Sequence, residues 1–348
     1  MNQFGTGTGQ PKVSVVIPVY NGAKTIGSVL DAVYKSTYAN FEVIAVNDCS
    51  TDNCAEVLEK YAARYPLVLE TFDENRGVSR ARNTGAARAR GDILLFIDAD
   101  CIVLPDTIER AVERLGRGDS ICVGGAYTSD PWDDDFFSTF QSLYVHHVET
   151  KTEHPDYIAT HCMAIRREDF NRYGGFVEDS FIGHEASVED VEFCHRLIAD
   201  GHQLARPSDI QVQHMFRFSF LKSIRNAIKK SKYWTMYSLV NKDVTKDSGA
   251  ASYELKTDVA TQVINLCLVI AAVASGIWWL LLPVAFLYGV NLAVSYRLLA
   301  LIRRERGWWF LVRAMAYFQF VYPYIVAYGS FVGTVKYFWE VKLRHRYS

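Results

Sequence analysis

Two hydrophobic patterns follow one another repeatedly along the first part of the chain. Runs rich in β-branched residues, such as KVSVVIPVY and FEVIAVND, are separated by segments such as AKTIGSVLDAVYKS, whose apolar residues recur every three or four positions. The first pattern is typical of buried strands and the second of amphipathic helices. The alternation continues through LVLETF, GVSRARNTGAARARG, DILLFIDAD, PDTIERAVERL and SICVGGAY. Repeated strand–helix units predict an α/β domain over residues 12–216, with helices on both faces of a parallel sheet.

The pattern changes near the C-terminal end, where charge disappears over long stretches. Residues 259–296 contain no charged side chain over 38 positions, and residues 314–335 contain none over 22. Because a helix crosses a bilayer with about 20 apolar residues, the first stretch predicts two helices that turn near Trp278 to Pro283. The second predicts a third span, a bent hairpin around Pro323 or a segment in the membrane interface. The alternative is a buried helical core, which seldom lacks charge over such lengths.

These patterns divide the chain into a flexible N-terminus (1–11), the α/β domain (12–216), an interfacial helical linker (217–258) and transmembrane helices with a basic tail (259–348). Residues 219–240 alternate apolar with basic side chains, which predicts a helix on the membrane surface or a charged helix packed on the α/β domain. The positive-inside rule places the RRER loop and the KLRHRYS tail in the cytoplasm. The expected location is the inner cell membrane, with several spans and a cytoplasmic α/β domain.

Composition narrows the class of function. The formal net charge of -2 argues against nucleic acid as a partner, because phosphate binding needs a basic surface. The seven cysteines include no CxxC pair, which favours reduced thiols in a cytosolic compartment over a disulfide or zinc framework. The N-terminal MNQFGTGTGQPK has no apolar run, so a cleavable signal peptide is not expected.

Polar side chains follow several of the predicted strands. Tyr20 and Asn21 follow the first, Asp48 follows the second, and Asp98 and Asp100 follow the fourth. Ligands of α/β folds bind beyond the carboxyl ends of parallel strands, so these side chains are expected to share a crevice. Two carboxylates one position apart suit Mg²⁺ or Mn²⁺, which would neutralise a diphosphate. A solvated turn is the alternative explanation of an isolated Asp-x-Asp.

Four segments together resemble the family 2 nucleotide-sugar glycosyltransferases: VSVVIPVYNGAKTIGSVLDAV, FEVIAVNDCSTD, NRGVSRARNTGAARARGDILLFIDADCIVLPDTI and VEDVEFCHRLIADG. The resemblance covers the predicted α/β domain in register. It implies a GT-A fold, which is a Rossmann-like nucleotide-diphospho-sugar transferase domain, followed here by an all-α transmembrane region. It also implies a nucleoside-diphosphate sugar donor, Mn²⁺ or Mg²⁺ as cofactor, and inversion at the anomeric carbon.

The resemblance further implies roles for individual residues. The residues expected at the donor nucleotide are Pro18, Tyr20, Asp48, Arg76, Arg80 and Asp98. Those expected at the metal are Asp98, Asp100 and His214. A structural histidine at a strand end is the alternative for His214, and Asn47 replaces the first acid of the family's usual Asp-Asp pair.

Glu189 and Asp190 match the pair that supplies the acid–base chemistry in this family. An acceptor hydroxyl needs a base when it attacks the anomeric carbon, and the resemblance implies Asp190 in that role. The alternative is a helix cap, because Ser187 and Asp190 have capping-box spacing ahead of an apolar-periodic helix that ends at Gly201. Both roles are compatible, since a helix N-terminus favours an ionised carboxylate.

The same pair bears on the acceptor. An already ionised phosphate oxygen needs no base, so the Glu-Asp pair favours a hydroxyl acceptor held at the bilayer, such as a lipid-linked sugar, over a polyprenyl phosphate. The processive synthases of this family usually carry a Gln-x-x-Arg-Trp motif after the base. Residues 215–240 contain no such motif, so the resemblance favours a single transfer. Two rivals stay open. One is a non-catalytic sugar-nucleotide-binding membrane scaffold. The other is a HAD-type phosphatase, because residues 98–102 nearly match the D-x-D-x-[TV] motif of that class.

Overall fold

The computed structural model describes residues 10–178, 188–244, 248, 249 and 251–342, which form two compact units. The first comprises the chain up to Asp134 and Glu149–Phe216, and the second comprises Asp135–Val148 and Arg217 onward. This division differs from the predicted boundaries in two respects. Residues 135–148 leave the α/β unit and pack with the second unit, and residues 217–258 belong to that unit instead of forming a separate linker.

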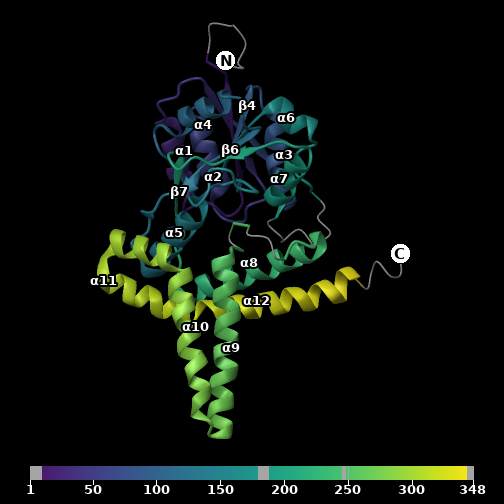
Figure 1. Ribbon diagram of the computed structural model, residues 1–348. Helices are drawn as coiled ribbons and strands as arrows, with labels where there is room; N and C mark the ends of the chain where they lie inside the picture. The colour runs from purple at the N-terminus through teal and green to yellow at the C-terminus, as the bar shows by residue number, and fades with distance from the viewer. Residues whose placement is uncertain (1–9, 179–187, 245–247, 250, 343–348) are drawn as a thin grey trace. The chain divides into compact units, whose positions relative to one another are not determined.

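The first unit is built on a seven-stranded sheet with the order β3-β2-β1-β4-β8-β6-β9 (Figure 1). Its strands are β1 (Val13–Val19), β2 (Phe41–Asn47), β3 (Leu67–Thr71), β4 (Ile93–Ile97), β6 (Cys122–Gly124), β8 (Cys162–Arg166) and β9 (Leu204–Ala205). The β3-β2-β1-β4 half is parallel, as predicted. The other half is mixed, because β8 runs antiparallel to both β4 and β6.

The physical reason for the mixed half lies in the connection after β4. Helix α4 (Thr107–Gly116) carries the chain past one position in the sheet before it enters β6. The gap between β4 and β6 is filled later by β8, which enters from the opposite direction. The prediction of an all-parallel sheet was therefore wrong for this half. The carboxyl ends of β1, β2 and β4 still share one edge, and that edge positions the site.

Helices cover both faces of the sheet, which explains why β1 and β4 are buried along their whole length. Helices α1 (Ile26–Tyr34) and α4 lie on the opposite side from α3 (Val78–Arg88) and α6 (Arg167–Arg172) in Figure 1. The remaining helices of this unit are α2 (Cys54–Ala62) and α7 (Glu189–Ala199). The core beside α3 and α7 contains the mutually packed rings of Phe96, Phe170, Phe176 and Phe193.

A second, three-stranded sheet has the order β5-β10-β7. It is formed by β5 (Cys101–Val103), β7 (Ala126–Tyr127) and β10 (Gln211–His214). The predicted SICVGGAY strand is thus divided between two sheets, with Gly125 between its halves. Because β10 pairs antiparallel with β5, its last residue, His214, lies opposite Cys101. This pairing joins two sequence motifs that lie more than a hundred residues apart.

The second unit is all helical. It comprises α5 (Phe136–Glu149), α8 (Phe220–Asn241), α9 (Tyr253–Ser275), a 3₁₀ turn (Trp278–Leu280), α10 (Leu281–Val294), α11 (Tyr296–Phe320), α12 (Tyr322–Lys336) and a π-helical end (Tyr337–Lys342). Helices α9 and α10 form the predicted hairpin, and α8, α11 and α12 run across its axis (Figure 1). The RRER segment lies inside α11, directly before a break at Gly307, so its prediction as a loop was wrong.

Two glycines let α12 pack closely along α8. Gly329 and Gly333 lie one turn apart, and a Cβ atom built on Gly333 would stand 2.3 Å from the backbone oxygen of Lys232. We expect Gly333→Ala to lower the stability of the protein by about 1–3 kcal/mol, because the neighbour it meets is backbone and has little freedom to move. The measurement is thermal unfolding in detergent. Gly289→Ala on α10 is the matched control, since its Cβ meets open space, and its melting temperature should not fall.

Candidate functional site

The Asp-x-Asp motif occupies the turn between β4 and β5. Strand β4 ends at Ile97 and β5 begins at Cys101, whose N–H donates to the Asp98 carbonyl at 3.0 Å. Because His214 lies opposite Cys101 in the β5–β10 ladder, its Nε2 atom stands 3.6 Å from Asp100 Oδ1. Asp100 and His214 are thus brought together by strand pairing, as the sequence-based assignment of a shared site requires.

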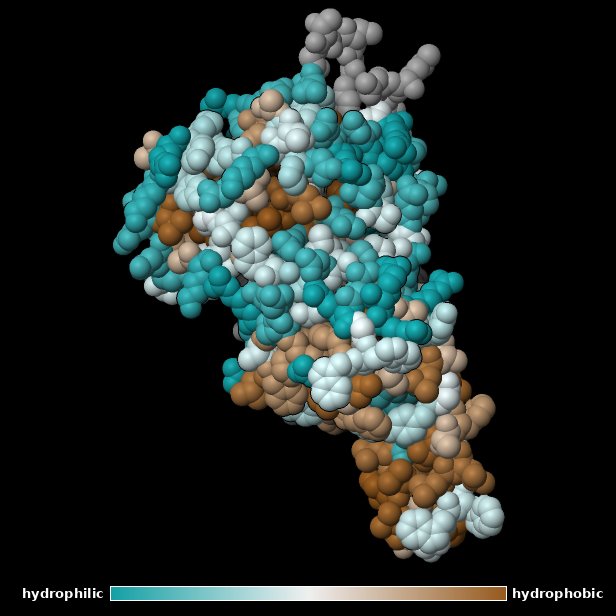
Figure 2. Space-filling view, turned by 90° about the vertical axis from the view of Figure 1, so that its left-hand side faces the viewer, coloured by the Kyte–Doolittle hydropathy of each residue, from teal (hydrophilic) through white to brown (hydrophobic). Residues whose placement is uncertain are grey.

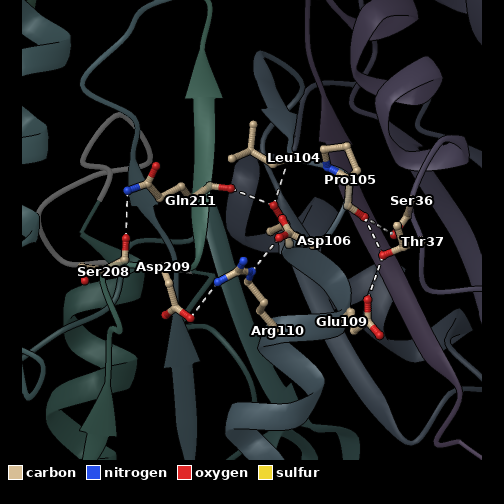
Figure 3. A network of polar contacts seen from close by, with 11 residues as sticks. Ser36, Thr37, Leu104, Pro105, Asp106, Glu109, Arg110, Ser208, Asp209 and Gln211 are labelled. Carbon is tan, nitrogen blue, oxygen red and sulfur yellow. Dashed lines mark hydrogen bonds and ion pairs between the residues drawn. The ribbon is translucent and has the colours of Figure 1, made fainter.

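A polar network fastens β10 to the helix that follows the motif (Figure 3). The Thr107 hydroxyl, at the start of α4, accepts from Leu104 N–H at 2.9 Å and donates to Gln211 O at 2.7 Å. Arg110 on the same helix pairs with Asp209, just before β10, at 2.9 Å. These contacts fix the strand that carries His214 relative to the segment that carries Asp100.

The donor atoms around this point fit a divalent cation. One oxygen of Asp100, Sγ of Cys101 and one nitrogen of His214 all lie within 4.8 Å of one another. Cys101 is buried, and burial raises the pKa of its thiol well above the usual value, so it stays protonated and is a poor ligand. Burial and the neighbouring Asp98 charge raise the pKa of Asp100 to about 6. A carboxylate and an imidazole suit Mn²⁺, and the carboxylate also suits Mg²⁺.

A buried arginine that the sequence interpretation missed connects Asp98 to the N-terminus of α7. Arg82 on α3 donates to Asp98 Oδ1 at 2.6 Å and to Glu189 Oε1 at 2.5 Å. Burial favours the neutral acid, but the guanidinium holds the pKa of Asp98 below its usual value. The signal in the sequence is that Arg82 shares a helix face with the small, core-facing residues Gly85 and Ala86.

Asp190 lies in the first turn of α7 and is half-buried. Its Oδ1 accepts from the N–H of Val191 at 2.8 Å, and the helix begins after Val188 without a side-chain cap. The predicted capping role of Ser187 falls outside the described residues. Burial and the adjacent Glu189 charge raise the pKa of Asp190 to about 7. A carboxylate with that pKa can accept a proton near neutral pH.

The residues expected at the nucleotide lie at the edge formed by β1 and β2. Pro18 is buried in β1 and the Tyr20 ring is exposed. Asp48 is buried, and its two carboxylate oxygens accept from the backbone N–H groups of Arg76 at 2.6 Å and of Gly77 at 2.9 Å. Asp48 therefore shapes the segment that enters α3. Its contact with a nucleobase stays a prediction.

The two arginines predicted at the nucleotide have different surroundings. The Arg80 side chain is half-exposed and forms an ion pair with Glu178. Arg76 lies over the Phe72 ring and stands 3.5 Å from Glu74. Arg76 lies on the segment that Asp48 holds, and Arg80 lies in the first turn of α3. The expected contact of each arginine with the donor nucleotide stays a prediction.

A second histidine, also absent from the sequence interpretation, is linked to His214 through the ring of Tyr127. His161 is buried, with Nε2 at 3.2 Å from Gly125 O and 3.7 Å from Glu149 Oε1. Its ring packs on Tyr127, which in turn meets the His214 ring edge-on. No local pattern marks His161, because it directly precedes an apolar strand and resembles an ordinary core position.

Comparisons with known proteins relate much of the first unit to one family. The family described as Glycosyl transferase family 2 matches residues 14–174. Glycosyltransferase GlyG of Streptococcus pneumoniae is 32% identical over 127 residues, 36% of this chain and 42% of that protein. Glycosyltransferase AglE of Haloferax volcanii is 30% identical over 209 residues, 58% of this chain and 66% of that protein. The aligned regions thus span less than two thirds of these curated relatives.

A solved structure resembles nearly the whole chain. It is a mannosyltransferase from Pyrobaculum calidifontis in complex with GDP-mannose and Mn²⁺, 20% identical, with a TM-score of 0.59 over 96% of this chain and 89% of its own. At this identity the likeness shows the fold. The first unit is a mixed α/β, Rossmann-like domain of the GT-A fold, followed by an all-helical region with two candidate apolar helices. Most of the match to the family described as Glycosyl transferase family 2, over residues 14–174, lies in this first unit.

Proposed function

We propose that the protein is a membrane-anchored, metal-dependent, inverting glycosyltransferase that moves a sugar from a nucleoside-diphosphate donor to a hydroxyl acceptor. The observation that carries this proposal is the chain of contacts from Asp98 through buried Arg82 to Glu189, which neighbours Asp190. It links the carboxylates suited to a metal ion, which follow β4, with Asp190, the carboxylate of raised pKa at the start of α7. A reaction that separates charge between a leaving diphosphate and an attacking hydroxyl needs both.

On the donor side, Asp100 and His214 are the residues that would hold the cation, with Asp98 beside them. A divalent cation at this position would neutralise the charge of the departing diphosphate. The GDP-mannose and Mn²⁺ in the Pyrobaculum structure support this class of donor and cofactor. Arg82 keeps Asp98 ionised and fixed in place, because one oxygen of that carboxylate is held by the guanidinium. Asp48 holds the segment containing Arg76, which would close over the nucleotide.

On the acceptor side, Asp190 would take the proton of the attacking hydroxyl. The acceptor oxygen forms a bond to the anomeric carbon while the bond from that carbon to the diphosphate oxygen breaks. A single displacement inverts the configuration, and no covalent sugar–protein bond forms. Arg82 holds Glu189 in place beside Asp190, and the Glu189 charge adds to burial in raising the pKa of Asp190.

The raised pKa of Asp190 predicts a pH dependence. Below a pH of about 7 the carboxyl is protonated and cannot accept the hydroxyl proton, so kcat/KM should fall about tenfold per pH unit. Initial rates at saturating Mn²⁺ between pH 5.5 and 8.5 measure the profile. The residual activity of Asp190→Asn should lack this inflection. An unchanged inflection in the variant would assign the titration to another group.

The surface of the α9–α10 hairpin supports membrane anchoring. The two candidate spans are Tyr253–Ser275 and Tyr296–Trp339, with a shorter apolar segment over Trp278–Val294. Side chains such as Ile270, Val273 and Phe286 point outward and are 59%, 67% and 71% exposed. Figure 2 shows hydrophobic residues over nearly the whole hairpin at the lower end of the view. An apolar outer face of this extent fits hydrocarbon better than water.

The charge distribution supports a cytoplasmic catalytic domain. Residues 217–348 contain 18 Lys and Arg against 6 Asp and Glu, and none of these lies between Val259 and Tyr296. Both flanks of the uncharged hairpin are therefore basic, which favours the same, inner side for both. Helices α8, α11 and α12 run across the hairpin axis, so in this proposal the hairpin crosses the membrane. The three helices would lie in the interface, although Tyr296–Trp339 is long and apolar enough to span. A lipid-linked sugar held at this surface is the acceptor that the arrangement favours.

The test is turnover of a panel of nucleotide sugars by the detergent-solubilised full chain, with Mn²⁺, Mg²⁺ or EDTA and with membrane lipid extract as acceptor source. We expect cation-dependent release of nucleoside diphosphate from one donor. Binding of donors without release in any combination would favour a non-catalytic scaffold. Transfer to a polyprenyl phosphate that is insensitive to Asp190→Asn would favour the alternative acceptor class.

A further inference from the structure

A cluster of buried polar side chains lies within the helical unit. Helix α9 contributes four of them, three or four positions apart, so that they share one face of the helix. We call the seven residues the polar cluster: Asp258, Thr261, Gln262 and Asn265 on α9, Asn291 on α10, Ser295 at its end and Gln319 on α11. Each is more than nine-tenths buried. The arrangement is inverted relative to a soluble helix, because the outer face of α9 is apolar and exposed.

Part of the polar cluster is satisfied internally. The Thr261 hydroxyl lies 2.6 Å from Asn291 Oδ1, and Gln262 Nε2 donates to Gln319 Oε1 at 2.9 Å. The rest is not. Among the residues that the structure describes, no hydrogen-bond partner is found for either carboxylate oxygen of Asp258, for Ser295 Oγ or for Asn291 Nδ2. Buried polar atoms in native proteins nearly always have a partner, so these atoms require a bound water or ion to complete them.

The register of the hairpin places these atoms on one level. Thr261 lies opposite Asn291 in the antiparallel pair α9–α10. One turn toward the start of α9 corresponds to one turn toward the end of α10, so Asp258 lies level with Ser295. Both residues are buried about one turn from the Thr261–Asn291 contact, and no hydrogen bond joins their side chains.

The Asn291 amide completes the oxygen set. Its oxygen and nitrogen positions are interchangeable at the level of heavy atoms. When the amide is turned, Nδ2 donates to the Thr261 hydroxyl, which can donate its own hydrogen to Thr257 O at 2.7 Å. This rotation gives Asn291 Nδ2 an acceptor, and it leaves Asn291 Oδ1 in the buried position that has no partner among the described residues, where it is available as a neutral oxygen ligand.

Charge decides which ligand class fits. No ion pair with Lys or Arg is found for Asp258 in the described parts of the chain, and the residue is almost fully buried. A buried unpaired carboxylate is very unfavourable, so it must be neutralised. An anion would worsen the imbalance, and a divalent cation would leave an excess positive charge. One positive charge with hard oxygen ligands fits the single carboxylate and the neutral oxygens around it.

We propose that the polar cluster binds a monovalent cation of the sodium class, with the Asp258 carboxylate as its charged ligand and Ser295 Oγ and Asn291 Oδ1 as neutral ligands. The site ties α9 to α10 at the base of the hairpin. It goes beyond sugar transfer and does not depend on it, since none of its residues belongs to the proposed catalytic centre.

The test is thermal unfolding of the full chain in detergent, with NaCl titrated against choline chloride at constant ionic strength. We expect a saturable rise in Tm of a few degrees with Na⁺, because a ligand that binds only the folded state stabilises it. Asp258→Asn should abolish the rise. Glu305→Gln, which removes an exposed acid on α11, should retain it.

Equilibrium dialysis of the wild type with ²²Na⁺ provides a second readout that does not require the variant to fold. Binding of about one ion per chain supports the site. A Tm that responds equally to Na⁺ and choline, together with no bound ²²Na⁺, overturns the proposal. It would mean that Asp258 is neutralised by a proton instead.

Discussion

Replacement of Asp190 by Asn should lower kcat about 10²- to 10⁴-fold, the range by which a positioned general base accelerates proton transfer. Asn is isosteric with Asp and can still accept the Val191 N–H, so the start of α7 should be unchanged. The amide cannot take the hydroxyl proton at any pH. Donor binding should stay within about threefold of the wild type, because Asp190 acts on the acceptor. Single-turnover rates and donor titrations measure the two effects separately.

Glu192→Gln is the matched control. It removes another acid from the first turn of α7, one that pairs with Arg196 at 2.7 Å. We expect its kcat to change less than about twofold, since the Glu192–Arg196 ion pair is only partly buried and such pairs contribute little. Equal losses in the two variants would mean that Asp190 acts through the helix terminus. Full activity of Asp190→Asn would contradict a hydroxyl acceptor and favour one that is already ionised.

Replacement of Arg82 by Met should destabilise the first unit by about 3–5 kcal/mol, because it leaves buried Glu189 and partly buried Asp98 without their counter-charge. The methionine fills much of the volume of the arginine stem, so loss of charge pairing is the main effect. Thermal unfolding of the full chain measures it. Arg80→Met on the same helix removes a half-exposed partner of Glu178 and should cost no more than about 1 kcal/mol.

A double variant distinguishes loss of the Arg82–Glu189 ion pair from simple loss of packing. Glu189→Gln removes the more deeply buried of the two charges, so Arg82→Met with Glu189→Gln should recover part of the lost stability. If the double variant is less stable than Arg82→Met by the full cost of Glu189→Gln alone, the two residues are not coupled. Arg82 would then be only a packing residue.

The acids of the site could be predicted from the sequence because they follow strands, and strand ends of an α/β sheet converge. Asp48, Asp98 and Asp100 all lie at the shared edge of β1, β2 and β4. Family resemblance added His214, whose proximity to Asp100 depends on the pairing of β10 with β5. That pairing is long-range, and no local period encodes it.

The features that were not predicted all depend on long-range packing, which a local sequence pattern does not record. The direction of β8 is not encoded in its apolar residues, because a five-residue buried run looks alike in parallel and antiparallel sheets. Arg82 was missed because a basic residue on a short helix is ordinarily solvent-exposed. Residues 135–148 were assigned to the α/β domain because their helical pattern does not show which unit they pack against.

In the proposed reaction centre, Asp100 acts on the donor side and Asp190 on the acceptor side. The most direct test of this assignment compares donor binding and turnover in two variants. Nucleoside diphosphate binding with and without Mn²⁺, and release from the nucleotide sugar, would be measured for wild type, Asp100→Ala and Asp190→Asn. We predict that Asp100→Ala loses the Mn²⁺-dependent part of binding, at least about tenfold, and turnover with it. Asp190→Asn should bind as the wild type does and fail to turn over. Mn²⁺-dependent binding that survives in Asp100→Ala, or is lost in Asp190→Asn, would contradict the assignment of the two sides.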